Sequence, residues 1–282
     1  MRWQDLRRSS NVDDRRGMSG GGKVALGGVG VIIVVVLGLL TGQDPGQIMD
    51  NLQGAQTTEQ TGARQPGPRP DDRTADLVTT VLGSTEDVWD KIYAENNAQY
   101  QQPTLQIFEN ATQGACGGAS AAMGPFYCPA DQQVYIDLSF CEELRTKFKA
   151  PGDFAVAYVI AHEVGHHVQN LMGISEKVQQ QRRRLSEADY NKLSVKLELQ
   201  ADFLAGVWAN RANQMKNILE PGDLEAALAA ANAIGDDKLQ KQSQGYVVPD
   251  AFTHGTSEQR MYWFKKGFDT GDLNQGRFDD IK

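Results

Sequence analysis

The chain has 282 residues, of which 28 are basic, 36 are acidic and four are histidine, and its formal net charge at pH 7 is -8. This acidic balance argues against a nucleic-acid partner, because phosphate backbones bind to basic surfaces. The length allows one large domain or two small ones.

The first 42 residues predict a membrane anchor. Residues 1–23 form a basic segment, and residues 24–42 contain no charged side chain. An apolar run of this length can just span a bilayer, and a basic flank on its N-terminal side usually remains in the cytoplasm. We therefore expect a single-pass membrane protein with a cytoplasmic N-terminus and an extracytoplasmic catalytic domain, facing the periplasm or the cell surface. A buried core helix and a cleaved signal peptide are the alternatives.

The folded part of the chain is expected to begin after residue 73. Residues 43–73 are rich in Gln, Gly, Thr, Pro and Asp and have no hydrophobic period, which predicts a disordered linker. Residues 74–282 should then form one domain. Its first segment, residues 74–96, has apolar residues at helical spacing and predicts two helices with a break near Gly83.

Strands are predicted in the region before the longest helices. Residues 103–110 resemble a strand, and residues 125–140 predict two short strands around a Pro-Ala-Asp turn. Pro129 favours an edge position, because proline cannot donate a hydrogen bond to a neighbouring strand. The sequence therefore predicts a small sheet with an exposed edge.

The three cysteines predict one disulfide bond. Cys116 and Cys128 flank a glycine-rich turn, and we expect them to pair if the domain lies outside the cytoplasm. Cys141 has apolar neighbours and is expected to be a buried thiol.

Four helices are predicted in the second half of the chain. Periodic apolar residues indicate them at residues 151–173, 187–213, 223–239 and 256–271, and Asp153 is expected to be the N-cap of the first. The basic run of residues 182–184 is expected to lie on a solvated helix face. The predicted fold class is α+β and mostly helical, preceded by one transmembrane helix.

The segment AHEVGHHVQ, residues 161–169, contains three of the four histidines. His162 and His166 are four residues apart, so they project from the same side of a helix and could bind one tetrahedral zinc ion. Glu163 follows the first histidine, where its carboxylate can act as a general base on water; this is the H-E-x-x-H pattern. His167 points to another side and is expected to pack or to support a ligand. Paired histidines without a metal are the alternative.

The segment ELQAD in the next long helix predicts the remaining protein ligand. A catalytic zinc ion needs a third protein ligand and one open position. Glu198 is our candidate, because a carboxylate beside an apolar stripe needs a positive partner. Asp202, one turn later, is expected to accept the N–H of a ligand histidine. An ordinary solvated helix face is the alternative for both residues.

The fourth histidine opens the segment HGTSEQR. His254 could donate to the oxyanion that forms when water attacks a carbonyl, and Arg260 could pair with Asp202 or with a substrate. Tyr127 and Tyr135 are weaker candidates for the same donor role. A loop histidine without a role is the alternative.

These motifs together resemble a known family. HEVGHHVQ, ELQAD, GPFYCPADQQVYIDLSF and HGTSEQR, in this order, are similar to the neutral zinc metallopeptidase family of bacterial membrane proteins, of the YpfJ type. The resemblance implies a zincin-like domain with a gluzincin arrangement, in which His162, His166 and Glu198 hold one catalytic zinc ion. The spacing of His254 and Arg260 is also similar to that of HtpX-like membrane metallopeptidases, which would place His254 at the oxyanion.

The expected function is that of a membrane-anchored zinc metalloendopeptidase. A zinc-activated water would attack the peptide bond, with Glu163 as general base, and the peptide or protein substrate would lie along the edge strand of residues 132–138. A zinc-binding interaction module without catalysis and an assembly factor are the alternatives. The presence of Glu163 favours the enzyme, because a site that only binds metal does not need this residue.

Overall fold

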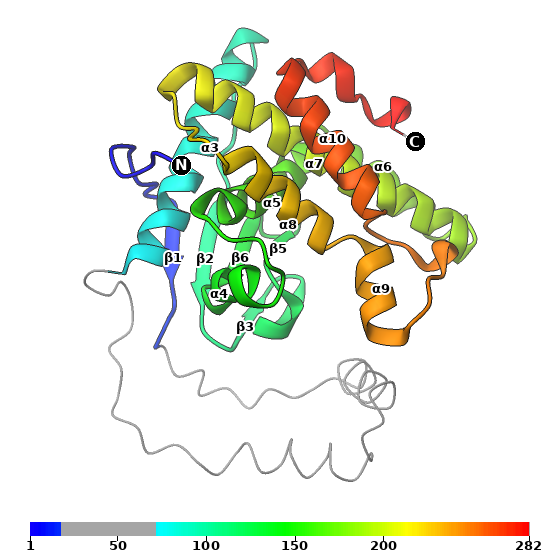
Figure 1. Ribbon diagram of the computed structural model, residues 1–282. Coiled ribbons are helices and arrows are strands. Elements are labelled where there is room, and N and C mark those ends of the chain that lie inside the picture. The colour runs from blue at the N-terminus through cyan, green and yellow to red at the C-terminus, as the bar shows by residue number, and fades with distance from the viewer. Residues whose placement is uncertain (18–71, 282) are drawn as a thin grey trace, which may run out of the picture.

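The computed structural model describes residues 1–17 and 72–281, and its elements form a mostly helical α+β fold with a small sheet (Figure 1). The sheet has the strand order β1-β2-β6-β5. Its strands are β1 (Val12–Asp14), β2 (Thr104–Phe108), β5 (Phe126–Cys128) and β6 (Gln133–Asp137). β1, β2 and β6 are parallel, and β5 runs antiparallel to β6. A separate hairpin is formed by β3 (Ala111–Gly114) and β4 (Gly117–Ser120).

The described helices are α3 (Arg73–Glu95), α4 (Ser139–Thr146), α5 (Asp153–Leu171), α6 (Ile174–Gln181), α7 (Glu187–Lys216), α8 (Asp223–Ala233), α9 (Asp236–Gln244) and α10 (Ser257–Thr270). Helix α5 is buried along almost its whole length and packs against α3, α7 and α8. Its sequence explains this position, because a helix that is apolar on nearly every side is stable only inside the core. Figure 1 shows α5, α7 and α10 gathered at one side of the sheet.

The N-terminal residues are part of this fold. Trp3 is buried, and its indole N–H donates to Asp153 at 2.8 Å. Ser9 and Asn11 both donate to the buried Glu86 of α3, at 2.6 and 2.8 Å. The strand β1 then pairs with β2. The beginning of the chain is therefore held by both the helices and the sheet.

The predicted single-pass membrane topology is wrong. Residues 24–42 lie outside the described residues, and within residues 1–17 and 72–281 no helix has both the length and the apolar character to cross a bilayer. The prediction also placed residues 1–23 and the catalytic domain on opposite sides of a membrane. Strands that share backbone hydrogen bonds must lie on the same side, and β1 is bonded to β2. The predicted linker of residues 43–73 lies almost entirely outside the described part of the chain.

The predicted break near Gly83 is also wrong, because α3 is one continuous helix of 23 residues. The glycine serves close packing instead. A Cβ atom at this position would lie 2.7 Å from the carbonyl oxygen of Arg7, so only glycine lets the N-terminal segment cross the helix here.

The predicted helix over residues 223–239 is divided in two. Helix α8 ends at Ala233, and α9 begins at Asp236. The break places Asp236 beside the loop that precedes α10, where its carboxylate accepts the backbone N–H groups of Thr253, His254 and Gly255. A local hydrophobic period could not reveal this contact, because its two sides are 17 to 19 residues apart.

Candidate metal centre

Three side chains from two helices meet at one point. His162 and His166 project from α5, and Glu198 projects from α7. Their ligand atoms all lie within 4.8 Å of one another. The Glu198 carboxylate is 3.1 Å from Nε2 of His162 and 3.5 Å from Nε2 of His166. Two ligands of a tetrahedral zinc ion are about 3.3 Å apart at normal bond lengths, so this donor set fits zinc.

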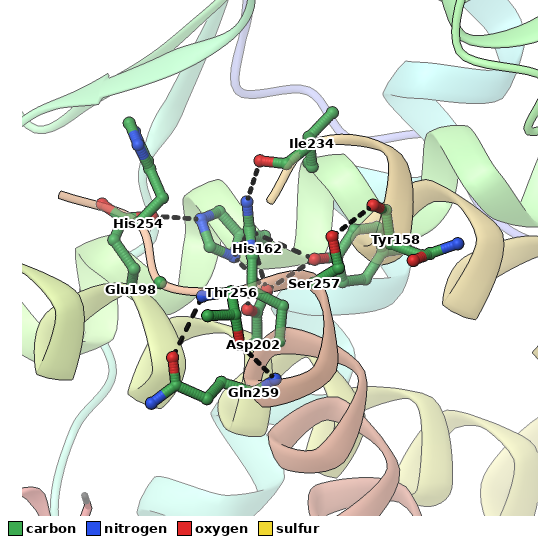
Figure 2. Close-up of polar contacts among 12 residues, drawn as sticks. Tyr158, His162, Glu198, Asp202, Ile234, His254, Thr256, Ser257 and Gln259 are labelled. Atoms are coloured by element: carbon green, nitrogen blue, oxygen red, sulfur yellow. Dashed lines mark hydrogen bonds and ion pairs between the residues drawn. The ribbon is translucent and has the colours of Figure 1, made fainter. Parts of the chain in front are cut away.

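The other ring nitrogen of each histidine is held by a buried side chain. Nδ1 of His162 is 2.8 Å from the carboxylate of Asp202, and Nδ1 of His166 is 2.9 Å from the amide oxygen of Gln169. Both acceptors favour the tautomer that carries its proton on Nδ1, which leaves Nε2 free to bind a metal. Figure 2 shows His162 between Glu198 and Asp202.

Asp202 is the centre of a buried polar network. Arg260 of α10 makes two hydrogen bonds to its carboxylate, at 2.8 and 3.0 Å, and Tyr158 of α5 donates a third at 2.5 Å. Arg260 therefore pairs with Asp202, as one of the two sequence-based interpretations stated. Sequence analysis missed Tyr158, although it lies four residues before His162 and so on the same side of the helix.

The close approach of α5 and α7 depends on a glycine, which has no side chain. Gly165 of α5 faces α7, and a Cβ atom there would lie 3.0 Å from the carbonyl oxygen of Ala201. A larger residue would push apart the helix that carries the two histidines and the helix that carries Glu198. The glycine inside the H-E-x-x-H segment thus lets the ligands from the two helices meet.

Without a metal, the nearby carboxylates raise the pKa values of the two histidines in the centre. Burial alone would lower the pKa of His162, but Asp202 and Glu198 raise it to about 10. Burial also opposes ionisation of Glu198, and the two histidines still hold its pKa well below the ordinary value. The pKa of His166 is raised as well, because Glu198 outweighs burial. Without a metal, His162 is therefore protonated at neutral pH.

We expect zinc to bind more tightly as the pH rises. Zinc takes neutral imidazole, so binding at pH 7 must displace the proton on His162, whose pKa is raised to about 10, and the raised pKa of His166 acts in the same direction. Each displaced proton should raise the affinity by about tenfold per pH unit. Competition with a chromophoric chelator between pH 6 and pH 9 measures the slope. An affinity that does not change over this range would contradict the expectation.

The Gln169→Leu substitution should weaken zinc binding. Gln169 accepts from His166, and its amide nitrogen donates to the carbonyl of Leu197 and to Gln200, which in turn donates to Gly276. Loss of such a partner of a ligand histidine typically costs about 10- to 100-fold in metal affinity. The same chelator competition tests this, with Gln214→Leu on the exposed side of α7 as the matched control. Equal affinity in both variants would show that Gln169 does not orient the ligand.

The centre lies in a cleft of about 1330 Å³. His162, Glu163, His166 and Glu198 line it from α5 and α7, and His254 lines it from the loop before α10. Glu163 makes no hydrogen bond or ion pair with the described residues, and burial raises the pKa of its carboxyl group. A carboxylate that faces a cleft without a protein partner is available for proton transfer.

His254 is oriented by a carboxylate that sequence analysis did not identify. Its Nδ1 is 3.1 Å from Asp236, whose other oxygen holds the backbone of the same loop. Burial opposes a charge on His254, but the pKa of its imidazole is raised because Asp236 and Glu198 are close. The side chain is about half exposed within the cleft, and in its charged form it can present an Nε2 proton there.

The remaining predicted site residues lie farther along the sheet. Tyr127 lines the cleft, but its hydroxyl is 3.0 Å from Nδ1 of His167, whose Nε2 donates to the carbonyl of Gln101. That hydroxyl therefore donates to His167 and is not free for a substrate. Tyr135 donates to Asp131 and is not among the residues that line the cleft.

The three cysteines form one disulfide bond and one free thiol. Cys116 and Cys128 form a disulfide bond, which ties the β3–β4 hairpin to the end of β5. Cys141 is a free thiol and is half-buried rather than fully enclosed.

Comparison with known proteins identifies the family. A family model described as "Putative neutral zinc metallopeptidase" matches residues 1–278. The chain belongs to this family. The chain is 48% identical to the YpfJ protein of Escherichia coli over 281 residues, which cover 98% of this chain and 97% of that protein. Its similarity to protein Mb2605 of Mycobacterium bovis is 43% identity over 185 residues, which cover 62% of this chain and 61% of that protein. No solved structure matches the chain significantly.

Membership of the zinc metallopeptidase family supports a zinc-dependent protease in general. It implies zinc as the metal and peptides or proteins as the substrates. The group of His162, His166 and Glu198 is where the described residues could bind this metal.

Proposed function

We propose that this chain is a zinc-dependent metalloendopeptidase with a gluzincin-like ligand set. The observation that carries the proposal is that two histidines of α5 and one glutamate of α7 aim their ligand atoms at one point on the wall of a large cleft. His162, His166 and Glu198 would hold the zinc ion and leave one position open. When bound, zinc supplies a Lewis acid that polarises a carbonyl group and lowers the pKa of a water molecule.

Glu163 would transfer the proton in this reaction. It accepts a proton from the attacking water and then gives that proton to the leaving amine. Its burial favours this double role, because a raised pKa makes the carboxyl group both a useful base and a useful acid near neutral pH.

His254 would stabilise the negative charge that develops on the carbonyl oxygen. Asp236 accepts the proton of Nδ1, so Nε2 can donate a second proton only when the ring is charged. The raised pKa of His254 favours the charged ring, which is the stronger donor. His254 lies in the segment between α9 and α10, and Asp236 is the first residue of α9.

An extended peptide would lie beside β5 and not along residues 132–138. The earlier expectation for β6 is wrong, because β6 pairs with β2 on one side and with β5 on the other. β5 ends the sheet, packs close to α5 and lines the cleft with Phe126 and Tyr127. An edge strand can bind an extended chain through backbone hydrogen bonds.

Removal and return of the metal tests the function. The native chain should cleave internally quenched peptides from a mixed library, lose this activity after dialysis against a chelator, and recover it with one equivalent of zinc. Mass spectrometry of the products should find cuts inside the peptides. A chain that binds zinc but cleaves no peptide in the library would instead support the zinc-binding interaction module.

A further inference from the structure

A basic turn lies in the same cleft as the metal centre. Arg182, Arg183 and Arg184, called the basic turn below, follow the last residue of α6 and precede α7. All three line the cleft, together with Glu198 and His254. The sequence prediction placed them on a solvated helix face. They are exposed, but the turn directs them to the wall of the candidate active site.

The positive charge of the basic turn is not neutralised by the described part of the protein. None of the three guanidinium groups makes an ion pair or hydrogen bond with residues 1–17 or 72–281. In contrast, the arginines at positions 7, 8, 15, 16, 73, 145 and 260 all pair with carboxylates. Carboxylates are not scarce in this protein, because its 36 acidic residues outnumber its 28 basic residues. Three adjacent unpaired arginines in a cleft are therefore available to a ligand.

Two acidic side chains of the cleft wall have other partners and make no ion pair with the basic turn. Glu176 of α6 accepts a hydrogen bond from Gln180, and Glu143 of α4 pairs with Lys147 at 3.6 Å. The guanidinium carbon of Arg182 lies 5.1 Å from the ring centre of Tyr190, which also lines the cleft. This stacking orients one arginine without using its hydrogen-bond donors.

The side of the cleft formed by β5 and α4 has a different character. Met123, Pro125, Phe126, Phe140 and Phe148 line it. The cleft thus combines an apolar wall with a positively charged wall. Guanidinium groups bind carboxylates in a planar, two-point geometry, so the charged wall selects a substrate feature that the apolar wall cannot.

We infer that the basic turn is a substrate subsite for a carboxylate, so that this peptidase prefers acidic peptides. The inference rests on the proposed function, because it names the substrate class of the same cleft. The carboxylate could belong to an aspartate or glutamate side chain or to the C-terminus of a short peptide. Both present the same group to the arginines.

Matched peptides separate the two sources. We would use one peptide sequence with either glutamate or glutamine at the positions flanking the cleaved bond, each as a C-terminal acid and as an amide. Binding is followed by fluorescence anisotropy with the zinc-loaded Glu163→Gln chain, and cleavage is followed with the native chain. The glutamate peptides should bind about tenfold more tightly than the glutamine peptides at low salt. The difference should shrink in 0.5 M salt, because exposed charges are screened.

The decisive variant replaces the three arginines by glutamine. The preference for the acidic peptide should then fall to about one. The control replaces Lys91, Lys177 and Lys241 by glutamine, which removes the same charge from exposed positions outside the cleft. This control should keep the preference. If the C-terminal acids bound more tightly than the amides with either residue, and the triple arginine variant removed this difference, the subsite would be assigned to the peptide terminus.

The outcomes distinguish the subsite from the enzymatic function. Equal binding of all four peptides, or a preference that survives in the triple arginine variant, would overturn the subsite. If the native chain still cleaved both peptides, the peptidase would stand. If acidic peptides bound through the basic turn but no peptide was cleaved, the subsite would stand and the peptidase would fail.

Discussion

The Glu163→Gln variant is expected to lose peptide hydrolysis by about 10²- to 10⁴-fold, the usual contribution of a general acid–base. Its zinc content should equal that of the native chain, because Glu163 is not one of the three residues whose ligand atoms converge. The amide has the same shape as the carboxylic acid but cannot accept the proton. Hydrolysis rates with zinc-loaded protein, together with metal analysis, measure both effects.

A matched control for this substitution is Glu225→Gln, on an exposed position of α8. It should leave hydrolysis and zinc content unchanged. If Glu163→Gln retained its activity, another base would have to be found. If it lost zinc, Glu163 would be needed for the structure of the centre and the rate could not be interpreted.

The second large effect is expected from Arg260→Met. Arg260 and Asp202 are both almost completely buried, and their charges compensate each other at 2.8 Å. Methionine would leave the Asp202 carboxylate buried without its main positive partner. Breaking a buried ion pair from one side typically costs about 3 to 5 kcal/mol. The free energy of unfolding of the zinc-free chain should fall by this amount in urea denaturation.

Arg145→Met is the control, because Arg145 pairs with Glu142 on the exposed side of α4. It should change stability very little. The double variant Asp202→Leu with Arg260→Met should lose less than the sum of the single variants, because it removes both buried charges together. Additive losses would show that the two residues do not act as a pair.

The candidate ligand residues could be predicted because helix geometry is local. Residues four apart project from the same side, so His162 with His166, and Glu198 with Asp202, were each recognisable as a pair. The need of a catalytic zinc ion for a third ligand then connected the two helices. Tyr158 has the same spacing from His162 and was missed, because a tyrosine among apolar residues resembles ordinary core packing.

The errors concern contacts between distant parts of the chain. The apolar run before the linker predicted a membrane topology from composition alone, but the β1–β2 pairing places the residues before that run in the same sheet as the domain. The strand of residues 133–137 was predicted at an edge, yet β2 and β5 flank it on both sides. The hydrophobic periodicity of a strand does not show which other strands pair with it, so neither pairing could be predicted from the segment alone.

The sequence by itself determined the family of this protein and its candidate site residues: a helix with two histidines and a glutamate, and a second helix with two carboxylates. Only the tertiary structure decided how these parts are supported. It placed Asp236 against His254, Gln169 against His166 and the basic turn on the wall of the cleft. The physical reason is that helical periodicity fixes neighbours within one turn, whereas contacts across the core depend on how closely the helices and strands pack.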